Sequence, residues 1–258
     1  MQHVGLTTEV AELVLVRHGE SAGNVADAEA RRQGLGRLEL ATRDADTPLS
    51  PDGEHQARAV RRHLGDLDAS QRPQVVVTSP YVRAARTAAL AVEGLEVDVV
   101  PDERLRERDL GAFDGLTGTG IRESFPEESR RRSMTGKFYY RPPGGESWTD
   151  VVLRIRQFLA ELRQGHGDRR VWIFTHQAVI MSFRFVLERL DESRLLEIDR
   201  SEALPNCSFT RYTRDAGGPL QLETFGATSH LASLDAPTTR EEPRHSPGDS
   251  PRESSSDG

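Results

Sequence analysis

Arg17 and His18 follow directly after the apolar run Leu13–Val16, and Gly19 comes immediately behind them. An imidazole and a guanidinium are thereby placed at the carboxyl end of a strand, the edge at which open α/β sheets bind ligands. The arginine fork fits phosphate oxygens, and a neutral histidine can act as a nucleophile. The pair predicts a phosphate site with a reactive histidine. The alternative is a strand that simply ends in two solvated polar residues.

Two further buried strands, expected at residues 74–78 and 170–174, are also followed by polar residues. Arg83 lies on the helix expected behind Thr78-Ser79-Pro80, and His176 follows the later strand. Because the carboxyl ends of parallel strands share one edge, the three polar clusters are expected to converge. Taken singly, Arg83 could be an exposed helix residue and His176 a satisfied core histidine.

The other elements are expected to position these clusters within an α/β domain. Capping residues and apolar periodicity predict helices at 51–65 and 147–163, a helix through Arg83 to Ala91, and another after His176. A short strand is expected at 97–100, and edge strands at 207–213 and 220–225. No regular element is expected between 101 and 145, and residues 26–47 are charged without clear periodicity.

A chain of 258 residues is long enough for one large α/β domain, and one is expected here. Its boundaries are predicted as a flexible N-terminus at 1–10, the domain at 11–228 and a disordered tail at 229–258, where Pro, Ser, Glu, Arg and Asp dominate. The segment 26–47 follows the Arg-His motif directly, so a lid over the site is a fair hypothesis.

Composition narrows the class of protein. The net charge of −7 argues against binding nucleic acid by bulk electrostatics, and the sequence has no apolar run of about eighteen residues to cross a membrane. The single cysteine, Cys207, and the absence of a signal-peptide pattern favour a cytoplasmic location. No cluster has metal-ligand spacing, so neither metal nor cofactor is expected, and the histidines outside the motifs are expected to be solvated.

Four segments occur in an order that resembles the histidine phosphatase superfamily, also called phosphoglycerate mutase-like proteins: LVRHGES at 15–21, SPYVRAART at 79–87, LRERDLGAFDG at 105–115 and FTHQAVIM at 174–181. The resemblance covers roughly residues 12–215 and implies a three-layer α/β/α sandwich with a mostly parallel central sheet. It implies that His18 is the nucleophile and becomes a transient phosphohistidine. It further implies that Arg17, Arg83 and His176 surround the phosphoryl group and that Glu107 donates the proton.

Elementary chemistry is consistent with those roles. Arg17, Arg83 and a protonated His176 could stabilise the equatorial oxygens of a phosphoryl transition state without a metal. His18 must attack as a neutral imidazole, so one ring nitrogen is expected to donate to an acceptor, such as a backbone carbonyl. Glu107 could instead be a loop charge among its charged neighbours.

A narrower resemblance, to the fructose-2,6-bisphosphatase branch, rests on FPEES at 125–129, KFYYRPPGGES at 137–147 and HQAV at 176–179. It implies that Arg132 and Lys137 bind a distal phosphate and that Gln177 contacts the substrate. Lys137 is the only lysine in the chain, which fits a specific role, although a chance surface lysine is the alternative. The chain departs from that branch where Gly118 and Trp148 replace aromatic rings and where Met181 replaces an arginine. The substrate-binding candidates are Asn24, Arg132, Lys137, Trp148 and Gln177.

These observations predict a metal-independent phosphatase that acts on a small phosphorylated metabolite, with a sugar phosphate as one candidate. A cofactor-dependent phosphoglycerate mutase is the first alternative. It is disfavoured because Gln177-Ala178 and Thr117-Gly118 stand where mutases usually carry Gly-Asn and Asn-Lys. A non-enzymatic module that binds a phospho-ligand is the second, disfavoured because His18 and Glu107 are both present. The oligomeric state is left open.

Overall fold

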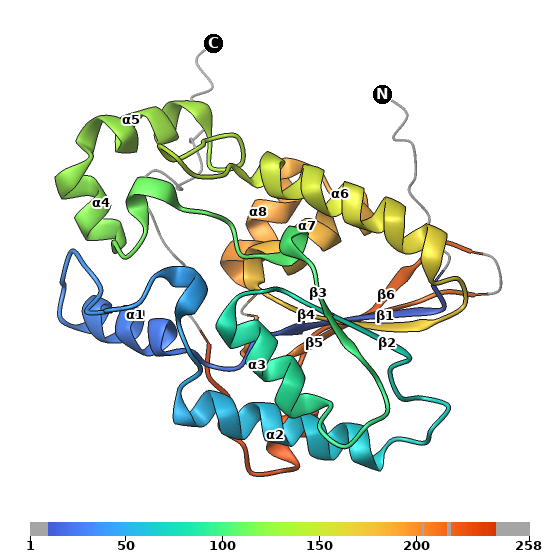
Figure 1. Cartoon of the computed structure of the whole chain (residues 1–258). Coiled ribbons are helices and arrows are strands. Elements are labelled where there is room, and N and C mark those ends of the chain that lie inside the picture. Colours follow the sequence, from blue (N-terminus) through green and yellow to red (C-terminus); the bar gives the residue numbers. More distant parts are fainter. Residues whose placement is uncertain (1–9, 203, 216–217, 241–258) are drawn as a thin grey trace.

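A computed structural model describes residues 10–202, 204–215 and 218–240, and its centre is a six-stranded mixed sheet (Figure 1). The strand order is β3-β2-β4-β1-β5-β6. The first four strands in this order are parallel, whereas β5 and β6 run antiparallel to their neighbours. The strands are β1 (Glu12–Arg17), β2 (Val75–Thr78), β3 (Val99–Pro101), β4 (Arg170–Thr175), β5 (Phe209–Thr213) and β6 (Gln221–Ala227). The predicted α/β architecture with a mostly parallel sheet is confirmed.

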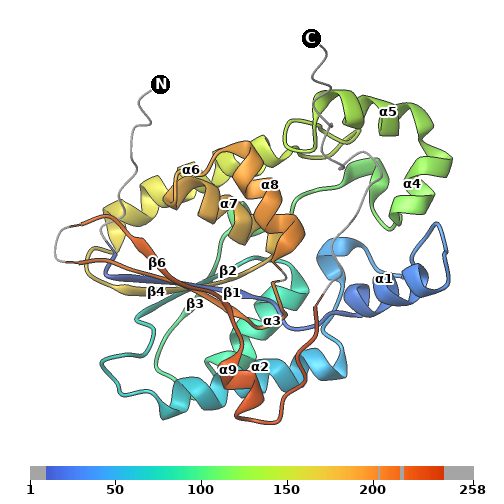
Figure 2. The ribbon, with the colours of Figure 1, turned by 180° about the vertical axis from the view of Figure 1, so that it is seen from behind.

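Helices cover both faces of the sheet, with α6, α7 and α8 on one face and α2, α3 and α9 on the other (Figures 1 and 2). In the described residues the helices are α1 (Ala22–Arg32), α2 (Pro51–Asp66), α3 (Val82–Ala91), α4 (Gly118–Ser124), α5 (Pro126–Thr135), α6 (Trp148–Gly165), α7 (Gln177–Leu187), α8 (Glu192–Ser201) and α9 (Ser229–Ala232). Three 3-10 turns are η1 (Asp44–Asp46), η2 (Glu103–Leu105) and η3 (Gly111–Phe113). Figure 1 shows α1, α4 and α5 projecting beyond the layers, on the side where the pocket described below opens.

The central strand β1 is buried along its whole length. Because successive side chains of a strand point to opposite faces, Leu13 and Leu15 join the core under α6 and α7, and Val14 and Val16 join the core under α2 and α3. The register aligns Arg17 with Thr175 of β4. His18 and His176 therefore follow neighbouring strands at the same edge.

The long helices begin where the sequence predicts. At α2 the side chain of Ser50 accepts a hydrogen bond from the backbone of Gly53, and Pro51 occupies the first turn. At α6, Ser147 and Asp150 form a reciprocal capping box. Local hydrogen bonds of this kind depend on close sequence spacing, so they can be read from the sequence alone.

The prediction of an irregular stretch at 101–145 is wrong between residues 118 and 135, because α4 and α5 lie there. Helix α5 buries none of its residues, so its sequence lacks the apolar periodicity that would predict a helix. Its helical signals are only Pro126 at the start and two acidic residues in the first turn. Helix α8 was also not predicted, and the predicted strand at 97–100 is confined to β3.

The expectation of a disordered tail from residue 229 is wrong for its described part. Residues 229–232 form α9, and the chain beyond it packs on α2, where the Gln56 side chain donates to the carbonyl of Pro237 over 2.9 Å. His230, which was expected to be solvated, is buried and stacks on Phe209 with ring centroids 3.8 Å apart. Val10, placed in the flexible N-terminus, is fully buried.

Residues 1–9 and 241–258 lie outside the described residues, so flexibility at those ends stays a prediction. Among the described helices, none has the length and apolar character needed to cross a membrane.

Candidate active site

The nucleophile candidate lies on a tight turn behind β1. The backbone of His18 donates to the carbonyl of Thr175 over 2.9 Å, which ties the turn to β4. Gly19 packs directly against the first turn of α2, and a Cβ atom on it would lie 2.5 Å from the carbonyl oxygen of Gly53. Only glycine fits such a close backbone approach. The close packing of α2 against this turn therefore requires glycine at position 19 of the motif.

The His18 ring is buried, and its Nδ1 lies 2.7 Å from the carbonyl oxygen of Gly19. A carbonyl can only accept, so Nδ1 carries the proton and Nε2 keeps its lone pair. This carbonyl is the backbone acceptor expected from the sequence. Burial lowers the pKa of His18 well below its usual 6.5, and the positive charges of Arg83 and Arg17 lower it further. His18 is therefore neutral at physiological pH.

His176 begins α7 and lies beside His18, with the two ring centroids 5.1 Å apart. Its Nε2 and the hydroxyl of Ser79 are 2.8 Å apart. Burial lowers the pKa of His176 well below 6.5, with Arg83 and His18 adding to the effect. The lowered pKa favours a neutral His176, because burial disfavours the charged ring and the guanidinium of Arg83 repels it. A protonated His176 around a phosphoryl group stays a prediction.

Two buried arginines flank the histidines. Arg17 is 1% exposed and donates from Nη1 to the carbonyl of Leu204 over 2.5 Å. Arg83 is 5% exposed and donates from Nη1 to the carbonyl of Asp44 over 2.6 Å, while its Nη1 lies 3.0 Å from Asp44 Oδ1. Arg83 is therefore buried and lines the pocket, so it is not an exposed helix residue, and its role at a phosphoryl group stays a prediction.

Glu107 lies in the loop behind η2 and lines the same pocket as His18 and Arg83. A carboxylate oxygen of Glu107 accepts from the backbone of Arg108 over 2.7 Å. Its loop is held from α6 by Arg154, which donates to the carbonyls of Arg104 and Glu107, the latter over 3.3 Å. Arg154 is in turn paired with Glu146, whose oxygens lie 3.1 Å from the guanidinium.

Glu146 also accepts from Arg106 over 2.6 Å and from the backbone of Asp109 over 3.1 Å. Arg154 and Glu146 thus clamp the loop on both sides of Glu107. Neither residue was predicted as part of the site. Glu146 stands inside the quoted GGES motif, but nothing in the sequence tells which loop its carboxylate holds.

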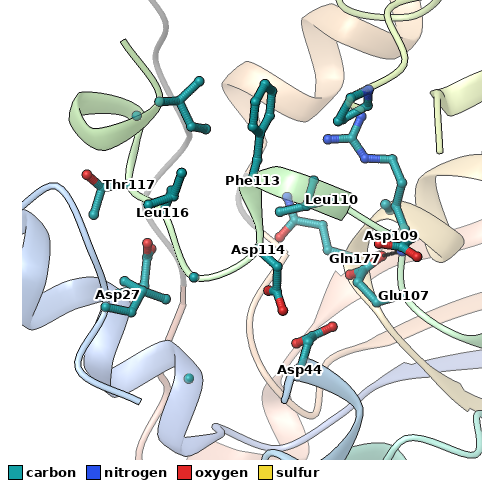
Figure 3. A pocket seen from close by; sticks show the side chains of 18 of the residues that line it. Asp27, Asp44, Glu107, Asp109, Leu110, Phe113, Asp114, Leu116, Thr117 and Gln177 are labelled. Carbon is teal, nitrogen blue, oxygen red and sulfur yellow. Dashed lines mark hydrogen bonds between the residues drawn. The ribbon is translucent and has the colours of Figure 1, made fainter. Parts of the chain in front are cut away.

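The pocket in front of these residues has a volume of about 800 Å³. Residues of α1, η1, η3, α4 and α5 line it, so the segment 26–47 forms one of its walls. Figure 3 shows carboxylates and apolar side chains projecting into the same space. Asp44 and Asp114 point toward one another there, and burial together with the charge of Asp44 raises the pKa of Asp114. Movement of the 26–47 segment as a lid stays a prediction.

Comparison with known proteins shows the family to which the chain belongs. The model of the histidine phosphatase superfamily, branch 1, matches residues 13–226. The chain belongs to this superfamily, and it is a phosphomonoester hydrolase of the histidine phosphatase type.

This histidine phosphatase is similar to two curated relatives and to one solved structure. It is 33% identical over 175 residues to a probable fructose-2,6-bisphosphatase of Schizosaccharomyces pombe, covering 68% of this chain and 38% of that relative. It is 31% identical over 237 residues to a probable phosphoglycerate mutase, GpmB, of Salmonella paratyphi C, covering 89% and 98%. The structure of a mycobacterial glucosyl-3-phosphoglycerate phosphatase in complex with VO3 has a TM-score of 0.67 and 29% identity, covering 84% and 100%.

The structure brings the five predicted catalytic candidates of this histidine phosphatase into one region. Arg17, His18 and His176 lie at the ends of β1 and β4, and Arg83 extends from α3. Glu107 lies in the loop behind η2, on the pocket wall. Of the five, His18, Arg83 and Glu107 line the pocket, whereas Arg17 and His176 lie buried behind it.

The predicted substrate-binding candidates all line the pocket, but their surroundings differ. Asn24 takes part in the capping box of α1 with Ser21, and it also accepts from Asn206 over 3.4 Å. Trp148 is 3% exposed and offers little surface to a ligand. Lys137 and Gln177 both bond to Asp199, which was not predicted. Asp44, the carboxylate on Arg83, was also missed, since it stands in a stretch without periodicity.

Proposed function

We propose that this histidine phosphatase hydrolyses the phosphate monoester of a small metabolite and that Nε2 of His18 attacks phosphorus. The observation that carries the proposal is the hydrogen bond from His18 Nδ1 to the Gly19 carbonyl. It leaves the Nε2 lone pair in a buried site with two guanidinium groups nearby. A neutral imidazole with a fixed tautomer is what nucleophilic attack on a phosphoryl group needs.

In the first step the His18 nitrogen bonds to phosphorus as the bond from phosphorus to the ester oxygen breaks. Arg17, Arg83 and His176 stabilise the charge on the three equatorial oxygens. Glu107, in its acid form, gives its proton to the leaving alkoxide. A water molecule then attacks the phosphohistidine, Glu107 takes a proton from that water, and inorganic phosphate and neutral His18 are regenerated. No step requires a metal ion.

His176 supports the anionic part of this scheme. Its Nδ1 is buried and has no hydrogen-bond partner within the part of the chain that the structure describes. Buried polar atoms nearly always find a partner, so a bound phosphoryl oxygen beside His18 is a suitable one. A bound dianion also raises the pKa of a neighbouring imidazole, which allows His176 to take up a proton on binding.

The pocket also constrains the leaving group of the substrate, because a volume of about 800 Å³ has room for considerably more than phosphate. The mycobacterial structure named above supports a phosphatase of a sugar-containing metabolite, and its complex with VO3 supports an anion site. We also propose a cytoplasmic location, which the single cysteine of the chain supports.

A phosphoglycerate mutase is the second candidate, favoured by the likeness to GpmB. Conversion of 3-phosphoglycerate into its 2-isomer, stimulated by 2,3-bisphosphoglycerate, would favour it. Phosphate release without isomerisation favours the phosphatase.

The proposal is tested with a panel of sugar phosphates, phosphoglycerates, nucleotides and phosphopeptides, assayed for phosphate release in EDTA. We expect hydrolysis of a small metabolite and an acid-labile, base-stable phosphoenzyme after rapid quenching. His18→Ala should abolish both, while His55→Ala, an exposed histidine of α2, should change neither. Wild-type turnover by His18→Ala would overturn the nucleophile assignment, and loss of activity in EDTA would overturn metal independence.

A further inference from the structure

Lys137, the only lysine of the chain, forms an ion pair with Asp199. Its Nζ lies 2.9 Å from Oδ2 of Asp199, and the two side chains are only 12% and 9% exposed. Both residues line the substrate pocket. An ammonium paired with a carboxylate in so sheltered a place attracts a further anion only weakly, because the pair is close to neutral.

The second oxygen of Asp199 is also engaged. Gln177 donates from Nε2 to Asp199 Oδ1 over 3.3 Å, and Gln177 directly follows His176. Figure 3 shows Gln177 among the side chains of the pocket. Asp199 thus accepts hydrogen bonds from two pocket residues: Gln177, next to His176 in the sequence, and Lys137. It takes the two donors that a second anionic group of a substrate would need at this place.

Helix stability does not explain this carboxylate. Asp199 lies in the last turn of α8, where the helix dipole disfavours a negative charge. Leu195 and Ile198 on the same helix are buried, so the helix is anchored and holds Asp199 against the pocket. The carboxylate therefore has a role in the pocket and not in the helix.

We propose that Asp199 is a specificity-determining residue that makes the pocket prefer substrates with a single phosphate over those with a second phosphate on the leaving group. The inference rests on the proposed phosphatase function and names its substrate class. A second phosphate would have to displace the carboxylate from Lys137 and then lie beside that negative charge. Specificity of this kind comes from repulsion of the wrong ligand as much as from attraction of the right one.

The test compares glucose 1-phosphate with glucose 1,6-bisphosphate as competitive inhibitors of p-nitrophenyl phosphate hydrolysis by the full chain. For the wild type we expect the bisphosphate to bind no more tightly than the monophosphate. Asp199→Asn keeps the size of the side chain and frees the lysine charge. It should tighten inhibition by the bisphosphate about tenfold, the effect of about 1.4 kcal/mol, and change that of the monophosphate far less.

Two further variants make the result specific. Glu197→Gln removes the same charge from an exposed site of the same helix, where the carboxylate is 58% exposed and pairs with Arg194, and it should leave both inhibitors unchanged. Asp199→Asn combined with Lys137→Met should lose the gain. Equal tightening of both inhibitors by Asp199→Asn, or no tightening of either, would overturn the inference.

Failure of the proposed function gives a different result. If hydrolysis of p-nitrophenyl phosphate does not depend on His18, the proposed function fails. Calorimetric titration of the same two sugar phosphates into wild type and Asp199→Asn then decides the role of Asp199 by itself. A wild-type protein that binds the bisphosphate more tightly than the monophosphate would contradict the role of Asp199 in that experiment too.

Discussion

The two ends of the pocket are built in different ways. At the phosphoryl end, Arg17, His18, Arg83 and His176 are each at most 5% exposed and are tied to strand ends, to α3 and to α7. At the leaving-group end, the walls come from the segment 26–47, the Glu107 loop and helices α4 and α5, and α5 buries none of its residues. Under the proposed function, the ends of the sheet strands hold the groups that every phosphate ester would meet, whereas loops and surface helices hold the groups expected to tell one ester from another.

Glu107 gives the largest expected difference between the two ends. Glu107→Gln should lower kcat/KM, which reports the step that releases the alcohol, about 10²- to 10⁴-fold for an alkyl phosphate such as β-glycerophosphate, whose leaving alkoxide needs a proton. It should affect p-nitrophenyl phosphate much less, because p-nitrophenolate leaves without one. Glu103→Gln, an exposed carboxylate in the preceding turn, is the matched control. Equal losses on the two esters would contradict a role as the acid.

Arg83 should behave in the opposite way. Arg83→Met removes a charged donor from the phosphoryl end and should lower kcat/KM about 10²- to 10³-fold. The loss should be similar for all esters, because the phosphoryl group is common to them. Arg86→Met changes a half-exposed arginine three residues further along the same helix, and it should have little effect. A loss that varies strongly with the leaving group would break the division between the two ends.

Arg154 should act on chemistry only through Glu107. Arg154→Met removes the donors to the carbonyls of Arg104 and Glu107 and should reproduce the leaving-group pattern of Glu107→Gln with a smaller loss, about tenfold. Arg163→Met, an exposed residue of the same helix, serves as control. The ratio of kcat/KM values for alkyl and aryl esters is the measurement, since general damage to the fold would lower both alike.

Asp44 is the place where the leaving-group end touches the phosphoryl end. Its carboxylate lies on Arg83 and repels a bound dianion, so Asp44→Asn should tighten competitive inhibition by vanadate a few-fold. Asp46→Asn in the same 3-10 turn removes a carboxylate that pairs with Arg43 and should not. Weaker inhibition in Asp44→Asn would instead make Asp44 a support that orients Arg83.

The buried histidines predict a smaller effect on stability. The pKa values of His18 and His176 are lowered on folding, so below about pH 6.5 the unfolded chain binds protons that the folded protein does not. The free energy of unfolding should therefore fall as the pH falls from 6.5, by up to about 1.4 kcal/mol per pH unit for each such histidine. Urea unfolding of wild type and His176→Asn between pH 7 and 4.5 should show a shallower decline in the variant. Parallel declines would contradict a buried neutral His176.

Much of the fold and of the chemical centre could be predicted because the relevant signals are local. Arg17 and His18 end a buried strand, Ser50 and Ser147 cap helices, and the order of the motifs implies the family. Helices α5 and α8 could not be predicted in this way. The described part of the tail was predicted to be disordered because its composition is polar, and composition does not indicate the hydrogen bond from Gln56 to the carbonyl of Pro237.

The sequence by itself determined which polar residues come together at one edge of the sheet, since strand ends in a parallel sheet converge whatever their separation along the chain. Only the tertiary structure decided their states and partners. Burial and nearby guanidinium groups make His176 neutral, Asp44 lies on Arg83, Arg154 holds the Glu107 loop, and Asp199 occupies Lys137. These four outcomes depend on distances between side chains from different elements and on their removal from water, and neither quantity is encoded in local sequence spacing.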